Sequence, residues 1–277
     1  MIINILKISI LVSLVHVADC QSVAPKIKQD NKVYSAAMHK DIPVSLVFPK
    51  SYDSNSEKRF PVVYLLHGHS GNYTDYLTDA KDIQSLSDKN NAIFVCPDGG
   101  FGSWYFDSPI DSNFKYETFI ISELVTWIDN NYRTLKDKKF RAIGGLSMGG
   151  HGALYLAIRH PNVFSAAGSM SGGVDFRPFP NEWDIKLRLG KYVDNKEIWS
   201  KNCVTEMINQ IPENLRISVD CGRKDFFLEV NRSFHQKLQA AQIAHRYEES
   251  EGAHDWDYWD KSLPSMLTFL CQDFPKK

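Results

Sequence analysis

The sequence predicts an α/β fold in which a mostly parallel central sheet is covered by helices on both faces. Two observations support this fold class. Continuous apolar runs, such as 60–66 and 92–96, end in His-Gly and Pro-Asp-Gly, as strands buried on both faces do. Between these runs, apolar residues recur at helical spacing. Strands that alternate with helices pair in parallel and lie between two helical layers.

The strand candidates follow one another along the whole chain. From Val33 to Phe48, short apolar stretches are broken by Asp41 and Pro43, which indicates an antiparallel pair at a sheet edge. We expect the other strands at 60–66, 92–96, 140–143, 166–170, 217–221 and 244–247.

Helical periods fill the intervals between these strands. The apolar stripes lie at 120–128, at 148–158, at Phe234, Leu238 and Ala241, and at 263–270. The stretch from Asp175 to Gln210 is irregular. We interpret it as an insertion after a strand, a cap-like segment placed to fold over a site.

Composition and charge bound the function. The 277 residues are 43% hydrophobic, which is enough for one sizeable core. Because no Pro-, Ser- or Gly-rich stretch divides the chain, we expect one domain over residues 21–277. The formal net charge is -1 and the sequence has no Lys/Arg cluster, so the protein lacks the positive electrostatic potential that attracts nucleic acid. We therefore expect no nucleic-acid partner.

The N-terminus has the pattern of an export signal. Residues Ile2 to Val17 are nearly all apolar around one early cation, Lys7, and small residues follow at cleavage positions. We predict that residues 1–20 are a signal peptide and that the mature chain is secreted or periplasmic. The apolar stretch of about 16 residues is shorter than the roughly 20 that span a bilayer, although an uncleaved anchor stays open. Cys20 leaves a lipoprotein as an alternative, which Asp19 disfavours.

The cysteines after residue 20 do not imply a disulfide framework. Cys96 and Cys221 each close a strand-like run, where a free thiol behaves as a small buried hydrophobic side chain. We therefore interpret these two, with Cys203 and Cys271, as reduced core residues, although three pairings stay open. None has the paired spacing of a zinc site.

The pattern Gly-x-Ser-x-Gly at 145–149 makes Ser147 a candidate nucleophile. An apolar run leads into it and a helical period leads out, so the serine is expected at a strand-to-helix turn. Small residues on both sides let the backbone pass through such a turn. The helix N-terminus then makes the Met148 N–H a candidate oxyanion donor. The alternative is that the glycines only serve close strand-to-helix packing.

A serine hydroxyl needs an imidazole to accept its proton and a carboxylate to orient that imidazole. In the fold that uses this turn, the chain order is serine, acid, histidine. His254 follows a strand into a Gly-containing loop, so we predict it as the general base, against the alternative of a packed or surface histidine. The other histidines after Ser147 fall in or beside predicted helices or in a strand: His151, His160, His235 and His245.

Asp225 is the predicted acid because it lies just beyond the strand at 217–221, at the carboxyl end where ligands bind. Asp220 is expected to lie still within that strand. Asp255 and Asp257 are too near His254 in sequence to reach its far nitrogen easily. A loop-capping role for Asp225 is the alternative.

The second oxyanion donor is expected from the loop after an earlier strand, where 65–71 reads Leu-Leu-His-Gly-His-Ser-Gly. We assign the donor to the backbone N–H of His69. We assign a structural role to His67, whose imidazole can fix the loop by hydrogen bonds. The side chains of His69, Trp104 and Tyr105 are candidates to line the acyl pocket, with packing as the alternative.

Several segments together are far more specific than any one alone: 64–68, 97–105, 116–119, 145–150 and 252–254. In these segments the chain resembles the putative-esterase family, which includes esterase D (S-formylglutathione hydrolase), feruloyl and acetylxylan esterases and mycobacterial mycolyltransferases. The resemblance runs from about Val33 onward and implies the α/β-hydrolase fold. It places nucleophile, acid and base on Ser147, Asp225 and His254, and the oxyanion donors on His69 and Met148.

The resemblance implies a serine carboxylic-ester hydrolase that works through an acyl-enzyme without metal or organic cofactor. Formylglutathione detoxification is cytosolic, whereas this chain has an export signal, so that substrate is not implied. Exported bacterial relatives often remove acetyl or feruloyl groups from plant polysaccharides, which makes carbohydrate esters the expected substrate class by analogy. Two alternatives are an acyltransferase to sugar hydroxyls and a non-catalytic hydrolase-fold protein that holds glycans.

Overall fold

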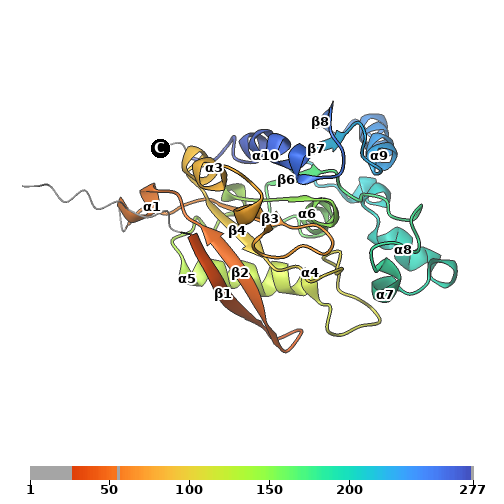
Figure 1. The fold of residues 1–277 in the computed structure, drawn as a ribbon, viewed down its shortest axis with the longest axis horizontal. Coiled ribbons are helices and arrows are strands. Elements are labelled where there is room, and N and C mark those ends of the chain that lie inside the picture. Colours follow the sequence, from red (N-terminus) through yellow and green to blue (C-terminus); the bar gives the residue numbers. More distant parts are fainter. Residues whose placement is uncertain (1–26, 55–56, 276–277) are drawn as a thin grey trace, which may run out of the picture.

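The computed structural model describes residues 27–54 and 57–275. Its centre is an eight-stranded sheet with the strand order β1-β2-β4-β3-β5-β6-β7-β8 (Figure 1). The predicted fold class, a mostly parallel sheet between helices, is confirmed. The strands are β1 (Ile27–Ser35), β2 (Lys40–Val47), β3 (Val62–Leu66), β4 (Ile93–Pro97), β5 (Arg141–Leu146), β6 (Ala166–Met170), β7 (Arg216–Gly222) and β8 (His245–Ser250).

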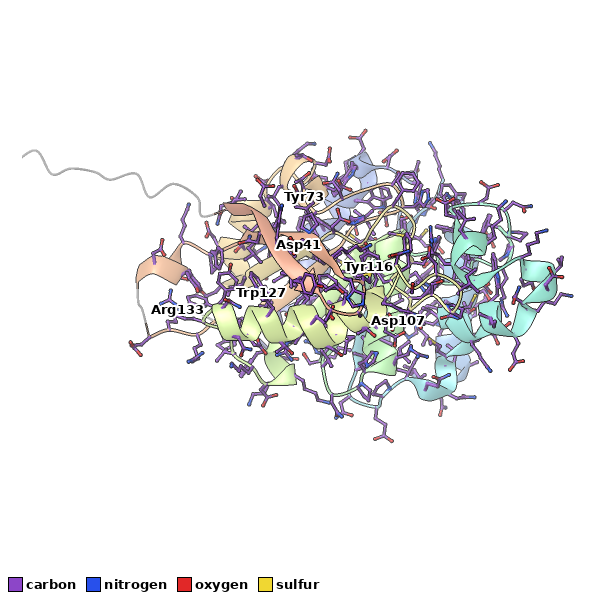
Figure 2. The ribbon with its side chains drawn as sticks, turned by 90° about the horizontal axis from the view of Figure 1, so that it is seen from below. Asp41, Tyr73, Asp107, Tyr116, Trp127 and Arg133 are labelled. Atoms are coloured by element: carbon purple, nitrogen blue, oxygen red, sulfur yellow. The ribbon has the colours of Figure 1, made fainter. Side chains whose placement is uncertain are left out.

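The strands β1 and β2 form an antiparallel hairpin at one edge of the sheet, as the sequence predicts. β2 runs antiparallel to β4, and the strand pairs from β4 to β8 in the sheet order are parallel. Figure 2 shows Asp41 on this hairpin and Trp127 on the helix that passes it. The backbone N–H of Ala37, in the hairpin turn, donates to Glu123 Oε1 of that helix at 2.9 Å.

Helices cover both faces because the inner strands are apolar on both sides. Val63 and Leu65 of β3 pack with α3 and α10, whereas Tyr64 and Leu66 pack with the layer of α5, α6 and α9. The helices are α1 (Ser51–Ser54), α2 (Asp75–Thr78), α3 (Ile83–Asn90), α4 (Tyr116–Thr118), α5 (Val125–Asn131), α6 (Met148–Arg159), α7 (Ile185–Leu189), α8 (Lys196–Asn202), α9 (Leu228–Ala240) and α10 (Trp256–Leu270).

The predicted helical stripes fall on helices of the structure, with differences in detail. A π-helical turn, Phe119–Leu124, joins α4 to α5, so the stripe at 120–128 lies in one continuous helical segment. α3 was not predicted, because only Ile83 and Leu86 among its eight residues are apolar. The irregular stretch 175–210 contains the short helices α7 and α8.

The predicted signal peptide, Cys20 included, lies outside the described residues. Within the ranges that the structure describes, no helix combines the length and the apolar composition that a membrane span requires. Cys96, Cys203, Cys221 and Cys271 are free and buried. Burial raises the pKa of the Cys271 thiol to about 12.

Glu117 joins the C-terminal end of α6 to α4. Its carboxylate accepts hydrogen bonds from Tyr155 Oη, Arg159 Nε and His160 Nε2, each at 2.8 Å. Burial alone raises the pKa of Glu117, but the bonds from His160, Arg159 and Tyr155 outweigh it and lower the pKa to about 2. The segment 116–119 therefore has a packing role in this fold.

His151 is enclosed by aromatic side chains within α6 and its surroundings. The rings of Trp104, Phe106, Tyr155 and Phe176 lie 5.4 to 5.5 Å from its imidazole, centroid to centroid. Burial lowers the pKa of His151 to about 3. The imidazole is therefore neutral at physiological pH.

Acid should destabilise the fold through His151. The unfolded chain takes up a proton near pH 6.5 and the folded chain only near pH 3, so stability present above pH 6.5 is lost as the pH falls through this window. Between pH 7 and pH 4.5, we expect the wild type to lose roughly 2–3 kcal/mol more unfolding free energy than His151→Leu. Urea unfolding at both pH values measures the difference, and equal losses would contradict it.

Candidate active site

Ser147 occupies the turn between β5 and α6. β5 ends at Leu146 and α6 begins at Met148, which confirms the predicted strand-to-helix turn. The serine has φ 55° and ψ -119°, a conformation that costs a side-chain-bearing residue of order 1–3 kcal/mol. Such strain persists only where the surrounding structure enforces it.

Two glycines make this turn possible. A Cβ on Gly149 would lie 2.1 Å from the carbonyl oxygen of Leu66, and a Cβ on Gly145 would lie 2.3 Å from the carbonyl oxygen of Gly149. α6 thus approaches β3 more closely than any side chain allows. The glycines therefore do serve close strand-to-helix packing, which was the alternative interpretation of the Gly-x-Ser-x-Gly pattern. The same packing also requires the sharp turn at Ser147.

The structure brings the three predicted triad residues together. His254 Nε2 lies 2.8 Å from Ser147 Oγ, and His254 Nδ1 lies 2.8 Å from Asp225 Oδ2. With Nδ1 protonated toward Asp225, Nε2 can accept the proton of the serine hydroxyl. The side chain of Asp225 is fully buried and that of His254 is 14% exposed, so water competes little for these hydrogen bonds.

Loops at the carboxyl ends of β7 and β8 hold the acid and the base. Asp225 follows β7, and its Oδ1 accepts the backbone N–H of Phe227 at 2.8 Å. His254 lies in the loop between β8 and α10. Asp255, which follows it, caps α10 by accepting the N–H of Tyr258 at 3.0 Å.

Asp220 lies within β7, as expected, and points away from the triad. It accepts hydrogen bonds from Tyr258 Oη at 3.0 Å and from Ser262 Oγ at 2.5 Å, both on α10. Burial raises the pKa of Asp220 to about 6. Asp220 therefore ties α10 to the sheet and leaves Asp225 as the carboxylate beside His254.

The loop after β3 contains both predicted histidines. The N–H of Gly99 donates to His67 Nε2 at 2.7 Å, and His67 Nδ1 donates to the carbonyl of Gly68 at 2.7 Å. Burial lowers the pKa of His67, which favours this neutral form. The structural role predicted for His67 is confirmed. His69 lines the same cavity as Ser147, and its ring Nε2 lies 3.3 Å from Asp184 Oδ2.

Met148 is the first residue of α6, so its N–H has no carbonyl one turn earlier in the helix to bind. This amide adjoins Ser147, as the assignment of an oxyanion donor requires. His69 lines the cavity at Ser147 and Met148 adjoins this serine in the chain, so the assignment of both as oxyanion donors stays a prediction.

Trp104 and Tyr105 correct our expectation for the acyl pocket. Their side chains are buried, and neither lines the cavity at Ser147. The Trp104 indole N–H donates to the carbonyl of Trp183 at 2.9 Å, and Tyr105 Oη donates to the carbonyl of His67 at 3.1 Å. Through these hydrogen bonds the two buried side chains support Trp183 and His67 from behind.

A cavity of about 500 Å³ opens above Ser147. Sequence reasoning missed most of its walls, although Phe226 and Trp256 lie within two residues of the predicted acid and base. Among the described residues, no three His, Cys, Asp or Glu side chains form a group able to hold a metal ion. The side chains that line the cavity besides Ser147, His254 and His69 include Asp75, Asp79, Trp183, Phe226, Trp256 and Trp259.

Comparison with solved structures identifies the architecture. A ferulic acid esterase superposes with a TM-score of 0.77 at 28% identity, over 90% of this chain and 99% of that chain. An S-formylglutathione hydrolase from Staphylococcus aureus gives a TM-score of 0.76 at 18% identity, over 88% and 99% of the two chains. The fold is that of the α/β-hydrolases, as expected.

Comparison of sequences identifies the family. An acetyl esterase of Caldicellulosiruptor saccharolyticus is 28% identical over 80% of this chain and 86% of its own. A mycolyltransferase of Mycolicibacterium smegmatis is 29% identical over 75% of each chain. The sequence model of the family described as "Putative esterase" matches residues 35–270, and the chain therefore belongs to this family.

Proposed function

We propose that the protein is a serine carboxylic-ester hydrolase that acts through an acyl-enzyme. The observation that carries the proposal is the continuous chain of two 2.8 Å contacts from Ser147 through His254 to Asp225, at a cavity open to substrate. The membership of an esterase family supports the same reaction class.

In the first half of the reaction, Ser147 Oγ attacks the ester carbonyl while His254 Nε2 accepts its proton. The oxyanion that forms receives hydrogen bonds from the amides of His69 and Met148. The tetrahedral intermediate then expels the alcohol, which takes the proton from His254. Asp225 stabilises the imidazolium in the meantime, and an acyl-enzyme results.

In the second half, water takes the place of the alcohol. His254 accepts a proton from the water, the water oxygen bonds to the acyl carbon, and the Ser147 ester bond breaks with return of the proton to Oγ. The chain's own residues make every proton transfer in this cycle, so the proposal requires no cofactor.

For the substrate, we propose short-chain acyl or feruloyl esters of carbohydrates. The names of two relatives, an acetyl esterase and a ferulic acid esterase, support this class by analogy. The similarity to a mycolyltransferase favours transfer to a sugar hydroxyl as a second candidate. Product analysis with and without an added sugar acceptor separates transfer from hydrolysis.

Replacement of the nucleophile should abolish turnover. We expect Ser147→Ala to lower kcat for 4-nitrophenyl acetate by at least about a thousandfold, because no other hydroxyl among residues 27–54 and 57–275 hydrogen-bonds to His254. Ser122→Ala, which changes an exposed serine of the helical segment before α5, is the control and should keep wild-type kcat.

A fluorophosphonate should label the wild type and the control but not Ser147→Ala. Labelling of Ser147→Ala, or its retained activity, would reject the proposal, and a wild type that binds glycans but takes no label would indicate a non-catalytic protein.

Two aspartates of one strand and its loop test the assignment of the acid. Asp225→Asn should lower kcat by about 10³ to 10⁴, because an amide cannot hold His254 with its proton on Nδ1. Asp220→Asn is the matched control and should keep kcat within a few fold, because this side chain contacts α10 and not the imidazole. Steady-state kinetics with circular dichroism as a check of folding measures both variants. The opposite ranking would move the acid to Asp220.

Export through residues 1–20 is also a proposal. When the full chain is expressed in a bacterium, mass spectrometry of the mature protein should find Gln21 as its first residue. A variant without residues 2–17 should remain inside the cell. If Cys20 is found to carry a lipid, the protein is a lipoprotein and not a soluble exported form. If the mature protein still begins at Met1, the proposal that residues 1–20 are cleaved is wrong.

A further inference from the structure

Two aromatic side chains, Phe226 and Trp183, form an aromatic wall of the cavity beside His254. Phe226 is 49% exposed although its ring is large and apolar. It stacks on Trp183, with ring centroids 5.3 Å apart and planes inclined by 18°. Both side chains line the cavity that contains Ser147. Exposed apolar rings in a cavity are the surface on which a ligand of matching shape gains binding energy.

This wall is fixed before any substrate arrives. Phe226 lies between Asp225, which accepts from the Phe227 N–H, and Phe227, whose ring packs 4.9 Å from that of Trp183. The carbonyl of Trp183 accepts the indole N–H of Trp104. Trp183 itself has φ 49°, a strained conformation, and its side chain reaches the cavity from the 175–210 insertion.

The position of the wall relative to His254 decides which part of an ester it faces. In acylation the imidazole returns its proton to the oxygen of the departing alcohol, so that oxygen must lie within hydrogen-bond reach of Nε2. The carbonyl oxygen points instead toward the amides of His69 and Met148. The ring of Phe226 lies 4.2 Å from the imidazole, centroid to centroid.

We propose, on the basis of the function proposed above, that Phe226 and Trp183 form the subsite for the alcohol part of the ester. The subsite takes alcohols that carry a ring, such as a sugar or an aryl ring, whose apolar face covers the phenyl ring of Phe226. As the Ser147–acyl bond forms and the acyl–alkoxy bond breaks, His254 protonates the alkoxy oxygen. The free alcohol then leaves along the wall.

The first test varies only the alcohol. For Phe226→Ala, kcat/KM should fall about tenfold with benzyl acetate and cyclohexylmethyl acetate and less than twofold with ethyl acetate. Comparing each ester with itself in the wild type removes differences between leaving groups. Phe226→Tyr keeps the ring face and should retain the preference. Tyr34→Ala, which removes another exposed aromatic ring, on β1, is the control. An equal loss with all three esters would overturn the proposal.

The second test separates an alcohol subsite from a support for His254. Every acetate ester forms the same acetyl-enzyme, and its hydrolysis needs His254 but no alcohol. In Phe226→Ala, the rate of acetyl-enzyme breakdown after the burst of 4-nitrophenol from 4-nitrophenyl acetate should equal the wild-type rate. A slower breakdown would make Phe226 a positioning residue for the imidazole and overturn the proposal.

The two proposals fail in different ways. If the wild type neither reacts with a fluorophosphonate nor forms an acetyl-enzyme, the esterase function itself is wrong. If it does both but Phe226→Ala treats the ring esters and ethyl acetate alike, only the alcohol subsite is wrong.

Discussion

The close approach of α6 to β3 is the constraint on which the rest of the site depends. Because Gly149 lies against the Leu66 carbonyl, the chain must leave β5 and enter α6 within the single residue Ser147. That turn presents the hydroxyl above the carboxyl ends of the strands and puts the first amide of α6 beside it. The same ends of β7 and β8 lead to Asp225 and His254, so the sheet aligns all three side chains.

Two carboxylates near the end of β7 show how environment divides roles. Asp220 points toward α10, where two hydroxyl groups bind it and burial raises its pKa to about 6. Asp225, five residues on, is past the strand and meets an imidazole and a backbone amide. Both residues are aspartates, so the side chain itself does not distinguish them. Asp225 faces His254 because it lies in the loop, whereas Asp220 lies in the strand. A similar division separates His67 and His151, whose pKa values burial lowers, from His254, which lines the cavity.

The sequence predicted those features that short patterns encode. The inner strands could be predicted because burial on both faces demands continuous apolar runs, and Ser147 and Asp225 because they follow such strands. His254 follows β8, a half-buried edge strand, so its prediction depended on the Gly-containing loop. α3 was missed because it covers the sheet with only one side and a few apolar residues. Trp104 and Tyr105 were assigned to the pocket by their aromatic character, but both are buried and donate to the carbonyls of Trp183 and His67, which no local pattern indicates. The wall of Phe226 and Trp183 arises from two distant segments that meet only in the folded chain.

The hydrogen bond between Ser147 and His254 joins residues 107 positions apart in the chain. Contacts of such separation form only after the long intervening loop has been closed, which is slow and follows local structure. During synthesis Ser147 leaves the ribosome well before His254, so every fragment that ends before β8 lacks the proposed general base. In the proposed mechanism, reactivity at Ser147 requires that the C-terminal segment with His254 has docked, so catalytic competence would report the completion of folding.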